Sequence, residues 1–205
     1  MPSKVPQRLT HPVILILAAG ASSRMRGRDK LLEPVAGEPL LARQMRMALA
    51  TGAPVLVALP PGDSPRRMLA VQAGVGLVDV ADCATGMAAS IRAGVAGVPD
   101  SATGLLLMLA DMPDIETSDL QQLLKAHAAD AAAILRAASA KGAPGHPILF
   151  PAPLFAALRR VQGDWGARDV LTAGRVQLIP LPGNRALIDL DTPEDWEWWR
   201  AGSGA

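Results

Sequence analysis

Basic residues follow a short apolar segment near the amino terminus, and a turn of small residues separates the two. The segment Val13–Leu17 runs into Ala18-Ala19-Gly20-Ala21-Ser22-Ser23, and the cations that follow are Arg24, Arg26, Arg28 and Lys30. Small side chains let backbone N–H groups approach an anion, and glycine adopts dihedral angles that other residues avoid. Arginine binds phosphate through parallel N–H donors, and lysine brings a mobile charge. This turn therefore predicts a site for the phosphates of a nucleotide; the alternative is a tight turn with solvated cations.

Carboxylates at two distant points of the sequence are candidates for binding a divalent cation. Asp111 follows the apolar run Leu105–Ala110, at the carboxyl end of a predicted strand, where ligands bind in open α/β sheets. Asp189 and Asp191 lie on one face of another predicted strand, because side chains alternate along a strand. Mg²⁺ prefers a few carboxylates together with substrate phosphates. Capping is the alternative role. Asp111 would then cap a helix or a turn, and Thr192 or Asp191 would cap the helix predicted from Pro193.

Several other kinds of site are absent from the sequence. The pattern G-x-x-x-x-G-K-[ST] is missing because Leu31 follows Lys30, and G-x-G-x-x-G does not follow the first strand. Cys83 is the single cysteine, which excludes an internal disulfide framework and a cysteine-based zinc site. No Ser-His-Asp or Cys-His arrangement is evident. The sequence therefore offers no candidate for a protein nucleophile.

The elements that must position these residues alternate between strands and helices. Apolar runs predict strands, and helical spacing or caps predict helices between them. The strands are expected at 13–17, 55–59, 76–80, 105–109, 132–135, 148–150, 176–179 and 187–190, and the helices at 40–50, 87–95, 118–128, 153–161 and 193–200. This alternation predicts an α/β fold, a Rossmann-like three-layer sandwich with a mostly parallel central sheet.

Length, composition and net charge indicate the broad class of protein. A chain of 205 residues with 50% hydrophobic residues can bury a sizeable core, and we expect a single domain over 13–200 after a flexible tail over 1–12. The tail has no apolar h-region, and no apolar run approaches the length of a membrane span. A net charge of +1 favours neither nucleic acid nor membrane. We therefore expect a cytoplasmic protein that binds neither.

The motifs resemble those of the molybdenum cofactor cytidylyltransferases within the MobA-like NTP transferases, which have a GT-A-like fold. They are L-A-A-G-x-S-x-R-M, G-M-A-A-S-I-R-A-G at 86–94, L-A-D-M-P at 109–113, G-H-P-I-L-F at 145–150, G-D-W-G-A-R at 163–168 and D-L-D-T-P-E-D at 189–195. Together they span most of the chain from Val13. The loop between Met25 and Lys30 departs from the family pattern by one extra residue, so Arg26 and Arg28 could share the phosphate contacts.

The resemblance implies transfer of a CMP moiety from CTP to the phosphate of molybdopterin, with release of pyrophosphate and with Mg²⁺ as cofactor. It implies catalytic roles for Arg24 and Lys30, metal binding by Asp111 and Asp191 (with Asp189 as the alternate), and an acceptor contact by His146. The expected nucleotide-binding residues are Leu17, Ala18, Ala19, Gly20, Ser22, Ser23, Arg24, Lys30, Gly86 and Ser90. Asp164 and Arg168 are expected to pair or to contact the acceptor's phosphate.

Rival functions remain open at this point. Another NTP or another phosphorylated acceptor would fit the same motifs, although Ala19 favours cytosine because the guanylyl branch tends to have L-A-G-G there. An NAD(P)H-dependent oxidoreductase would share the α/β fold, and the missing G-x-G-x-x-G speaks against it. A non-catalytic module that delivers the cofactor would keep the pocket without releasing pyrophosphate. The resemblance also implies a molybdenum hydroxylase or its chaperone as a partner of this protein.

Overall fold

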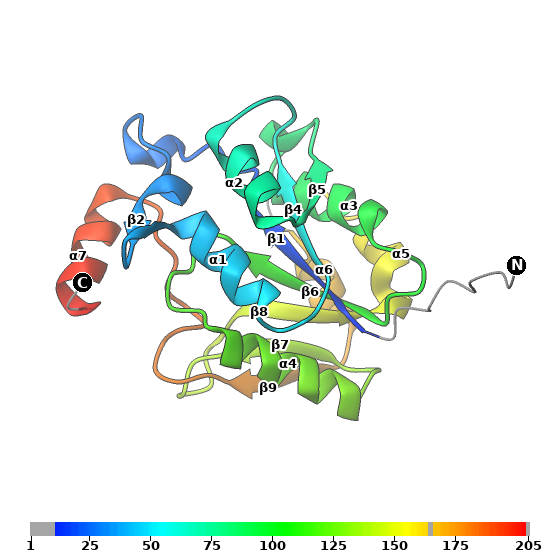
Figure 1. Ribbon diagram of the computed structural model, residues 1–205. Helices are drawn as coiled ribbons and strands as arrows, with labels where there is room; N and C mark the ends of the chain where they lie inside the picture. The colour runs from blue at the N-terminus through cyan, green and yellow to red at the C-terminus, as the bar shows by residue number, and fades with distance from the viewer. Residues whose placement is uncertain (1–10, 164–165, 204–205) are drawn as a thin grey trace, which may run out of the picture.

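The computed structural model describes residues 11–163 and 166–203, which form a seven-stranded sheet with helices on both faces (Figure 1). Across the sheet the strands run in the order β5-β4-β1-β6-β8-β7-β9. Their bounds are β1 Val13–Leu17, β4 Val55–Leu59, β5 Gly76–Asp79, β6 Gly104–Leu109, β7 Ile134–Ala138, β8 Pro144–Pro151 and β9 Val176–Pro180. β8 pairs antiparallel with β6 and β7, and the other neighbours pair parallel. The predicted mostly parallel α/β sheet is confirmed.

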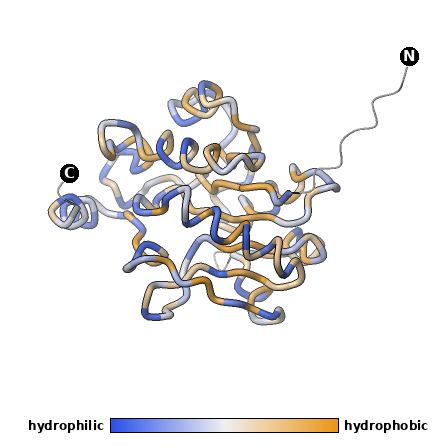
Figure 2. The backbone as a smooth tube through the Cα atoms, turned by 60° about the horizontal axis from the view of Figure 1, so that its bottom comes forward, coloured by the Kyte–Doolittle hydropathy of each residue, from blue (hydrophilic) through white to orange (hydrophobic). Residues whose placement is uncertain are grey.

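The first strand shows why these runs are continuously apolar. Ile14 and Ile16 belong to the core on one face of the sheet, and Val13 and Leu15 belong to the core on the other. All four are at most 1% exposed, as expected for a strand covered on both faces. In Figure 2 the central strands are mostly orange, which marks hydrophobic residues.

The helices divide between the two faces. One core takes residues from α1, α2, α4 and α7, and the other takes residues from α3, α5 and α6. Their bounds are α1 Leu40–Leu49, α2 Pro65–Ala73, α3 Met87–Gly97, α4 Thr117–Ala129, α5 Phe155–Leu158, α6 Arg168–Ala173 and α7 Pro193–Ser203. A short hairpin pairs β2 Pro34–Val35 with β3 Glu38–Pro39. The described residues include no helix that is long and apolar enough to cross a membrane.

Some sequence expectations differ from the structure. The predicted strand at 187–190 is a loop: Leu187 N–H donates to the Asn184 carbonyl, and Leu190 N–H donates to the Asp111 carbonyl. The helix predicted at 153–161 is shorter, a 3₁₀ turn Ala152–Leu154 followed by α5. Of the tail predicted at 1–12, residues 1–10 lie outside the described residues, and Pro12 is buried. The domain limits of 13–200 stay a prediction.

Candidate active site

A cleft of about 290 Å³ lies at the carboxyl ends of β1 and β6. Its position agrees with the rule that open α/β sheets bind ligands beyond the carboxyl ends of their strands. The lining residues are Leu17, Ala18, Ala19, Gly20, Arg24, Lys30, Leu31, Cys83, Gly86, Met87, Ser90, Leu109, Ala110, Asp111, Asp189 and Asp191. The cleft thus brings together most of the residues expected to bind nucleotide and metal. Ser22, Ser23 and His146 are not among the lining residues.

Two aspartates from distant segments meet at one lysine inside this cleft. The Lys30 ammonium lies 2.5 Å from Asp111 Oδ2 and 2.7 Å from Asp191 Oδ1. Arg24 reaches the other oxygen of Asp191 at 2.7 Å, with its side chain 65% exposed. The predicted cations and carboxylates therefore occupy a single site.

Backbone contacts hold the two acidic segments against each other. Leu190 N–H donates to the Asp111 carbonyl at 3.0 Å, so the residue between Asp189 and Asp191 is tied to the loop after β6. Asp195 accepts from the N–H groups of Asp191 and Thr192, while Thr192 Oγ1 accepts from Asp195 N–H. Thr192 and Asp195 thus make the reciprocal cap of α7. The Asp191 carboxylate takes no part in this cap and contacts Lys30 and Arg24 in the cleft.

The electrostatics of the site favour a charged lysine. Burial lowers the pKa of Lys30, but the charges and hydrogen bonds of Asp111 and Asp191 outweigh burial and raise the pKa overall. The pKa of Asp189 is also raised, by burial and then by the neighbouring charges of Asp111 and Asp191, but for a carboxyl group a raised pKa disfavours the charged form. Asp189 is therefore the aspartate whose ionised form the site disfavours.

The fit of this site to a divalent cation rests on its oxygen donors. Oδ1 of Asp111 is buried and has no hydrogen-bond partner among the described residues, which leaves one carboxylate oxygen unsatisfied. Buried polar atoms usually have a partner, so this oxygen is suited to accept a ligand. No group of three or more His, Cys, Asp or Glu side chains in the described ranges is placed to hold a metal. Two carboxylates with substrate phosphates match the way in which Mg²⁺ is bound.

A buried arginine that the sequence analysis missed lies behind the glycine turn. Arg66 of α2 is 7% exposed, and its guanidinium bonds to the turn and to Asp29. Ser22 faces this guanidinium at 2.9 Å and not the cleft. Nothing local in the sequence around Arg66 marks it, because its partners lie far away along the chain.

The amino-terminal end of α3 forms another wall. Gly86 precedes this helix with φ 104° and ψ −178°, a conformation that a residue with a Cβ avoids. Ser90 is buried one turn into the helix and lines the cleft. The two predicted residues are thus placed where a helix N-terminus attracts polar or anionic groups.

The extra residue in the loop is absorbed by two 3₁₀ turns, Ser23–Met25 and Lys30–Leu32, with Arg26 at φ 54° between them. Arg26 pairs with Glu194, and Arg28 pairs with Glu33 at 3.3 Å. Neither arginine lines the cleft. In this structure both arginines therefore contact carboxylates outside the cleft.

His146 lies beside Arg136, apart from the residues that line the cleft. Arg136 Nε donates to the Gly145 carbonyl at 3.0 Å, and Nδ1 of His146 is buried without a partner among the described residues. Burial and then the charge of Arg136 lower the pKa of His146 to about 4. Asp164, expected to pair with Arg168 or to contact the acceptor, lies outside the described residues.

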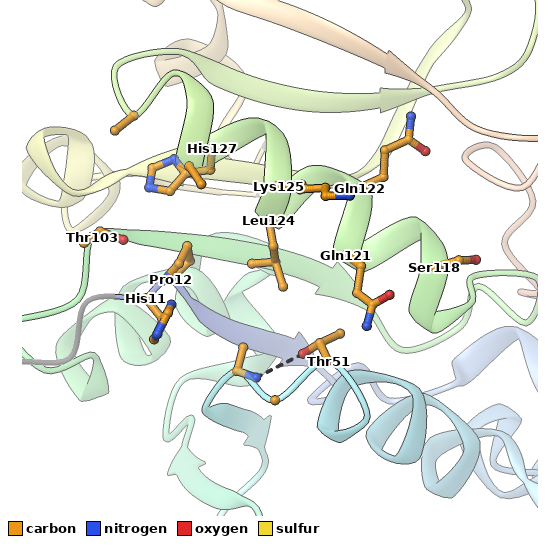
Figure 3. A pocket seen from close by; sticks show the side chains of 14 residues that line it. His11, Pro12, Thr51, Thr103, Ser118, Gln121, Gln122, Leu124, Lys125 and His127 are labelled. Carbon is orange, nitrogen blue, oxygen red and sulfur yellow. Dashed lines mark hydrogen bonds between the residues drawn. The ribbon is translucent and has the colours of Figure 1, made fainter.

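A larger hollow of about 1010 Å³ lies at the opposite edge of the sheet, near the amino ends of β1 and β6 (Figure 3). Helix α4 contributes Lys125, His127 and their neighbours to it. It contains no carboxylate and none of the residues predicted for catalysis. Size alone therefore does not identify the candidate active site, because the smaller cleft is the one that contains the carboxylates together with Arg24 and Lys30.

Known proteins resemble this chain along most of its length. The chain is 28% identical to the purine catabolism protein PucB of Bacillus subtilis, over 91% of this chain and 94% of PucB. It is 32% identical to a probable molybdenum cofactor guanylyltransferase of Synechococcus elongatus, over 89% of this chain and 95% of that protein.

Solved structures share the fold of this chain. Rv0371c of Mycobacterium tuberculosis superposes with a TM-score of 0.78 at 29% identity, covering 93% of this chain and 97% of that one. A complex of Rv0371c with manganese gives a TM-score of 0.76 at 27% identity, covering 92% and 97%. Residues 14–178 match the model of the MobA-like NTP transferase domain, and this protein therefore belongs to that family.

Proposed function

We propose that this nucleotidyltransferase moves the CMP moiety of CTP onto the phosphate of a molybdopterin-type acceptor. The observation that carries the proposal is the meeting of Lys30 and Arg24 with Asp111 and Asp191 in one cleft. Positive groups from the first βα turn thus face carboxylates from two later segments. A site of this kind suits transfer between two phosphates, where both substrates are anionic.

The reaction needs positioning and charge more than a protein nucleophile. An oxygen of the acceptor phosphate attacks the α-phosphorus of the nucleotide and forms the new P–O bond. The bond from the α-phosphorus to the bridging oxygen breaks, and pyrophosphate leaves with that electron pair. Lys30 and Arg24 neutralise the negative charge that collects on the departing pyrophosphate. Such electrostatic stabilisation and alignment account for catalysis in phosphoryl-type transfers.

A divalent cation, Mg²⁺ in this proposal, would be held by Asp111 and Asp191. When bound it would neutralise charge on the α-phosphate and align it with the acceptor. The manganese complex of Rv0371c supports the use of a divalent ion in the family. Lys30 now contacts both carboxylates, so its ammonium must exchange these contacts for phosphate when substrate and metal enter.

In this proposal the acceptor reaches beyond the residues that line the cleft, towards His146 and Arg136. The Arg136 guanidinium is half-buried and makes no ion pair with a carboxylate in the described part of the chain. A positive group without an acidic partner is suited to an anionic substrate group. Neutral His146 beside it offers a hydrogen bond to the acceptor without adding charge.

The alternatives to this proposal differ in the nucleotide that is used, in the acceptor, or in the type of reaction. The relative named as a guanylyltransferase makes GTP the competing nucleotide. A panel of CTP, GTP, ATP and UTP with Mg²⁺ and molybdopterin-type acceptors, read by pyrophosphate release, tests the assignment. Pyrophosphate release with CTP but not with GTP, ATP or UTP supports the proposal. A preference for GTP would show that the enzyme transfers GMP and not CMP. Nucleotide binding without pyrophosphate from any pair would point to the delivery module, and oxidation of NAD(P)H would point to the oxidoreductase.

A further inference from the structure

We propose that Arg66 is a positioning residue that turns the backbone of the glycine loop towards the triphosphate. The inference rests on the proposed function, because it assigns how that nucleotide site is built. Arg66 lies on α2, an element for which the sequence offered no chemical role, and it contacts the loop from behind. Arg66 does not line the cleft, so it acts through the loop and not by touching substrate.

One guanidinium makes five hydrogen bonds in this network, all between 2.6 and 2.9 Å. Nη1 donates to the carbonyls of Ala18 and Gly20. Nε and Nη2 donate to the two oxygens of Asp29, and Nη2 also donates to Ser22 Oγ. Every donor direction of the planar fork is directed at the loop or at Asp29.

These contacts set the direction of two peptide groups. In a trans peptide the N–H points opposite to the C=O, and among the described residues the one cis bond is His146–Pro147. With the carbonyls of Ala18 and Gly20 held by Arg66, the N–H groups of Ala19 and Ala21 point away from the guanidinium. Neither N–H donates a backbone hydrogen bond within residues 11–163 and 166–203. They are free to form an anion-binding nest for phosphate.

Asp29 connects Arg66 to the 3₁₀ turn Lys30–Leu32. Its Oδ1 accepts from Leu31 N–H at 3.0 Å as well as from Arg66. Burial raises the pKa of Asp29, but Arg66, Leu31 and Ser22 together lower it overall, so the carboxylate stays ionised. The pair thus links the direction of the glycine loop to the position of Lys30, the next residue in the chain.

Lysine cannot replace this arginine, because one ammonium group cannot reach carbonyls and both carboxylate oxygens in a plane. Arg66→Lys keeps the charge and removes the fork. Arg67→Lys is the matched control, since Arg67 is the next residue on α2 and also bonds to carbonyls, Gly62 and Pro60, and to Asp79. None of those partners lines the cleft.

The probe is inorganic tripolyphosphate, whose binding is measured by calorimetry on the full chain. We expect Arg66→Lys to weaken binding by about tenfold or more, because a small misplacement of binding groups is costly, and Arg67→Lys to change it by no more than about twofold. Amide ¹H–¹⁵N signals of Ala19 and Ala21 should shift on adding tripolyphosphate to the wild type and should shift less in Arg66→Lys. Asp29→Asn provides a second variant if Arg66→Lys does not fold.

The outcomes separate the inference from the proposed function. Wild-type affinity for tripolyphosphate in folded Arg66→Lys, or amide shifts unchanged by the substitution, would overturn the role of Arg66. Absence of tripolyphosphate and CTP binding in the wild type would instead overturn the nucleotide site itself. In turnover assays a positioning role raises KM for the nucleotide and leaves KM for the acceptor unchanged, which a general loss of stability would not do.

Discussion

The Lys30 ammonium lies 2.5 Å from Oδ2 of Asp111, although the two residues are separated by 81 positions in the chain. Lys30 comes from the loop after β1, and Asp111 follows β6, the strand beside β1 in the sheet. Parallel pairing brings the carboxyl ends of both strands to one edge, which is what allows this contact. The same lysine reaches Asp191 at 2.7 Å, so one cation compensates carboxylates that would otherwise repel each other.

This arrangement predicts that Lys30→Ala will cut turnover by about 100-fold or more, because one of the two cations proposed to neutralise the departing pyrophosphate is removed. The measurement is pyrophosphate release at saturating CTP. Lys125→Ala is the control, since Lys125 lines the opposite hollow. The fold should persist, as judged by circular dichroism. Turnover equal to that of the control variant would remove Lys30 from the mechanism.

The three aspartates of the cleft predict a graded effect on metal binding. Asp111→Asn and Asp191→Asn should each weaken Mn²⁺ binding by about tenfold or more, because each removes an ionised oxygen donor. Asp189→Asn should weaken it by less, because the pKa of Asp189 is raised by burial and by its acidic neighbours. Titration of Mn²⁺ with an unreactive CTP analogue, followed by electron paramagnetic resonance, measures all three.

The comparison between Asp189→Asn and Asp191→Asn decides which of the two aspartates is the second metal ligand. The two variants have the same chemistry and lie two residues apart on one loop, so each serves as the control for the other. A larger loss in Asp189→Asn would make Asp189 the second ligand and leave Asp191 as the partner of Arg24.

Much of the site could be predicted because its signals are local. The apolar run of β6 ends at Ala110, so Asp111 had to emerge at the edge where ligands bind. The small residues after Leu17 and the cations after Ser23 lie within one short stretch of sequence. The resemblance to a known family then joined these stretches to the acidic segment near Pro193.

The rest depended on contacts that no local pattern records. Arg66 and Asp29 are separated by 37 positions, and neither lies in a recognisable motif. The segment at 187–190 has the apolar composition of a strand, but Leu190 N–H bonds to Asp111 in place of a sheet partner. Asp189 and Asp191 still both reach the cleft, through a loop and not through strand alternation.

The proposed preference for CTP over GTP can be tested at Ala19. This side chain is 4% exposed and lines the cleft in which we propose that the nucleotide binds, so its methyl group limits the space there. Ala19→Gly should improve kcat/KM for GTP relative to CTP by about tenfold, because one methyl group in a pocket discriminates to roughly this extent. Rates for both nucleotides in wild type and variant give the ratio. An unchanged ratio would show that the base is selected elsewhere in the cleft.

The histidine beside Arg136 predicts a pH dependence of stability. Burial and then Arg136 lower the pKa of His146 from 6.5 to about 4 in the folded chain. Between these two values the unfolded chain binds a proton that the folded chain does not, so the free energy of unfolding falls as pH falls from 6.5 to 4. His146→Gln removes this dependence, and the wild type should lose about 1–3 kcal/mol relative to the variant across that window. Urea unfolding at several pH values measures the difference, with His11→Gln as the control, and parallel curves for wild type and His146→Gln would contradict it.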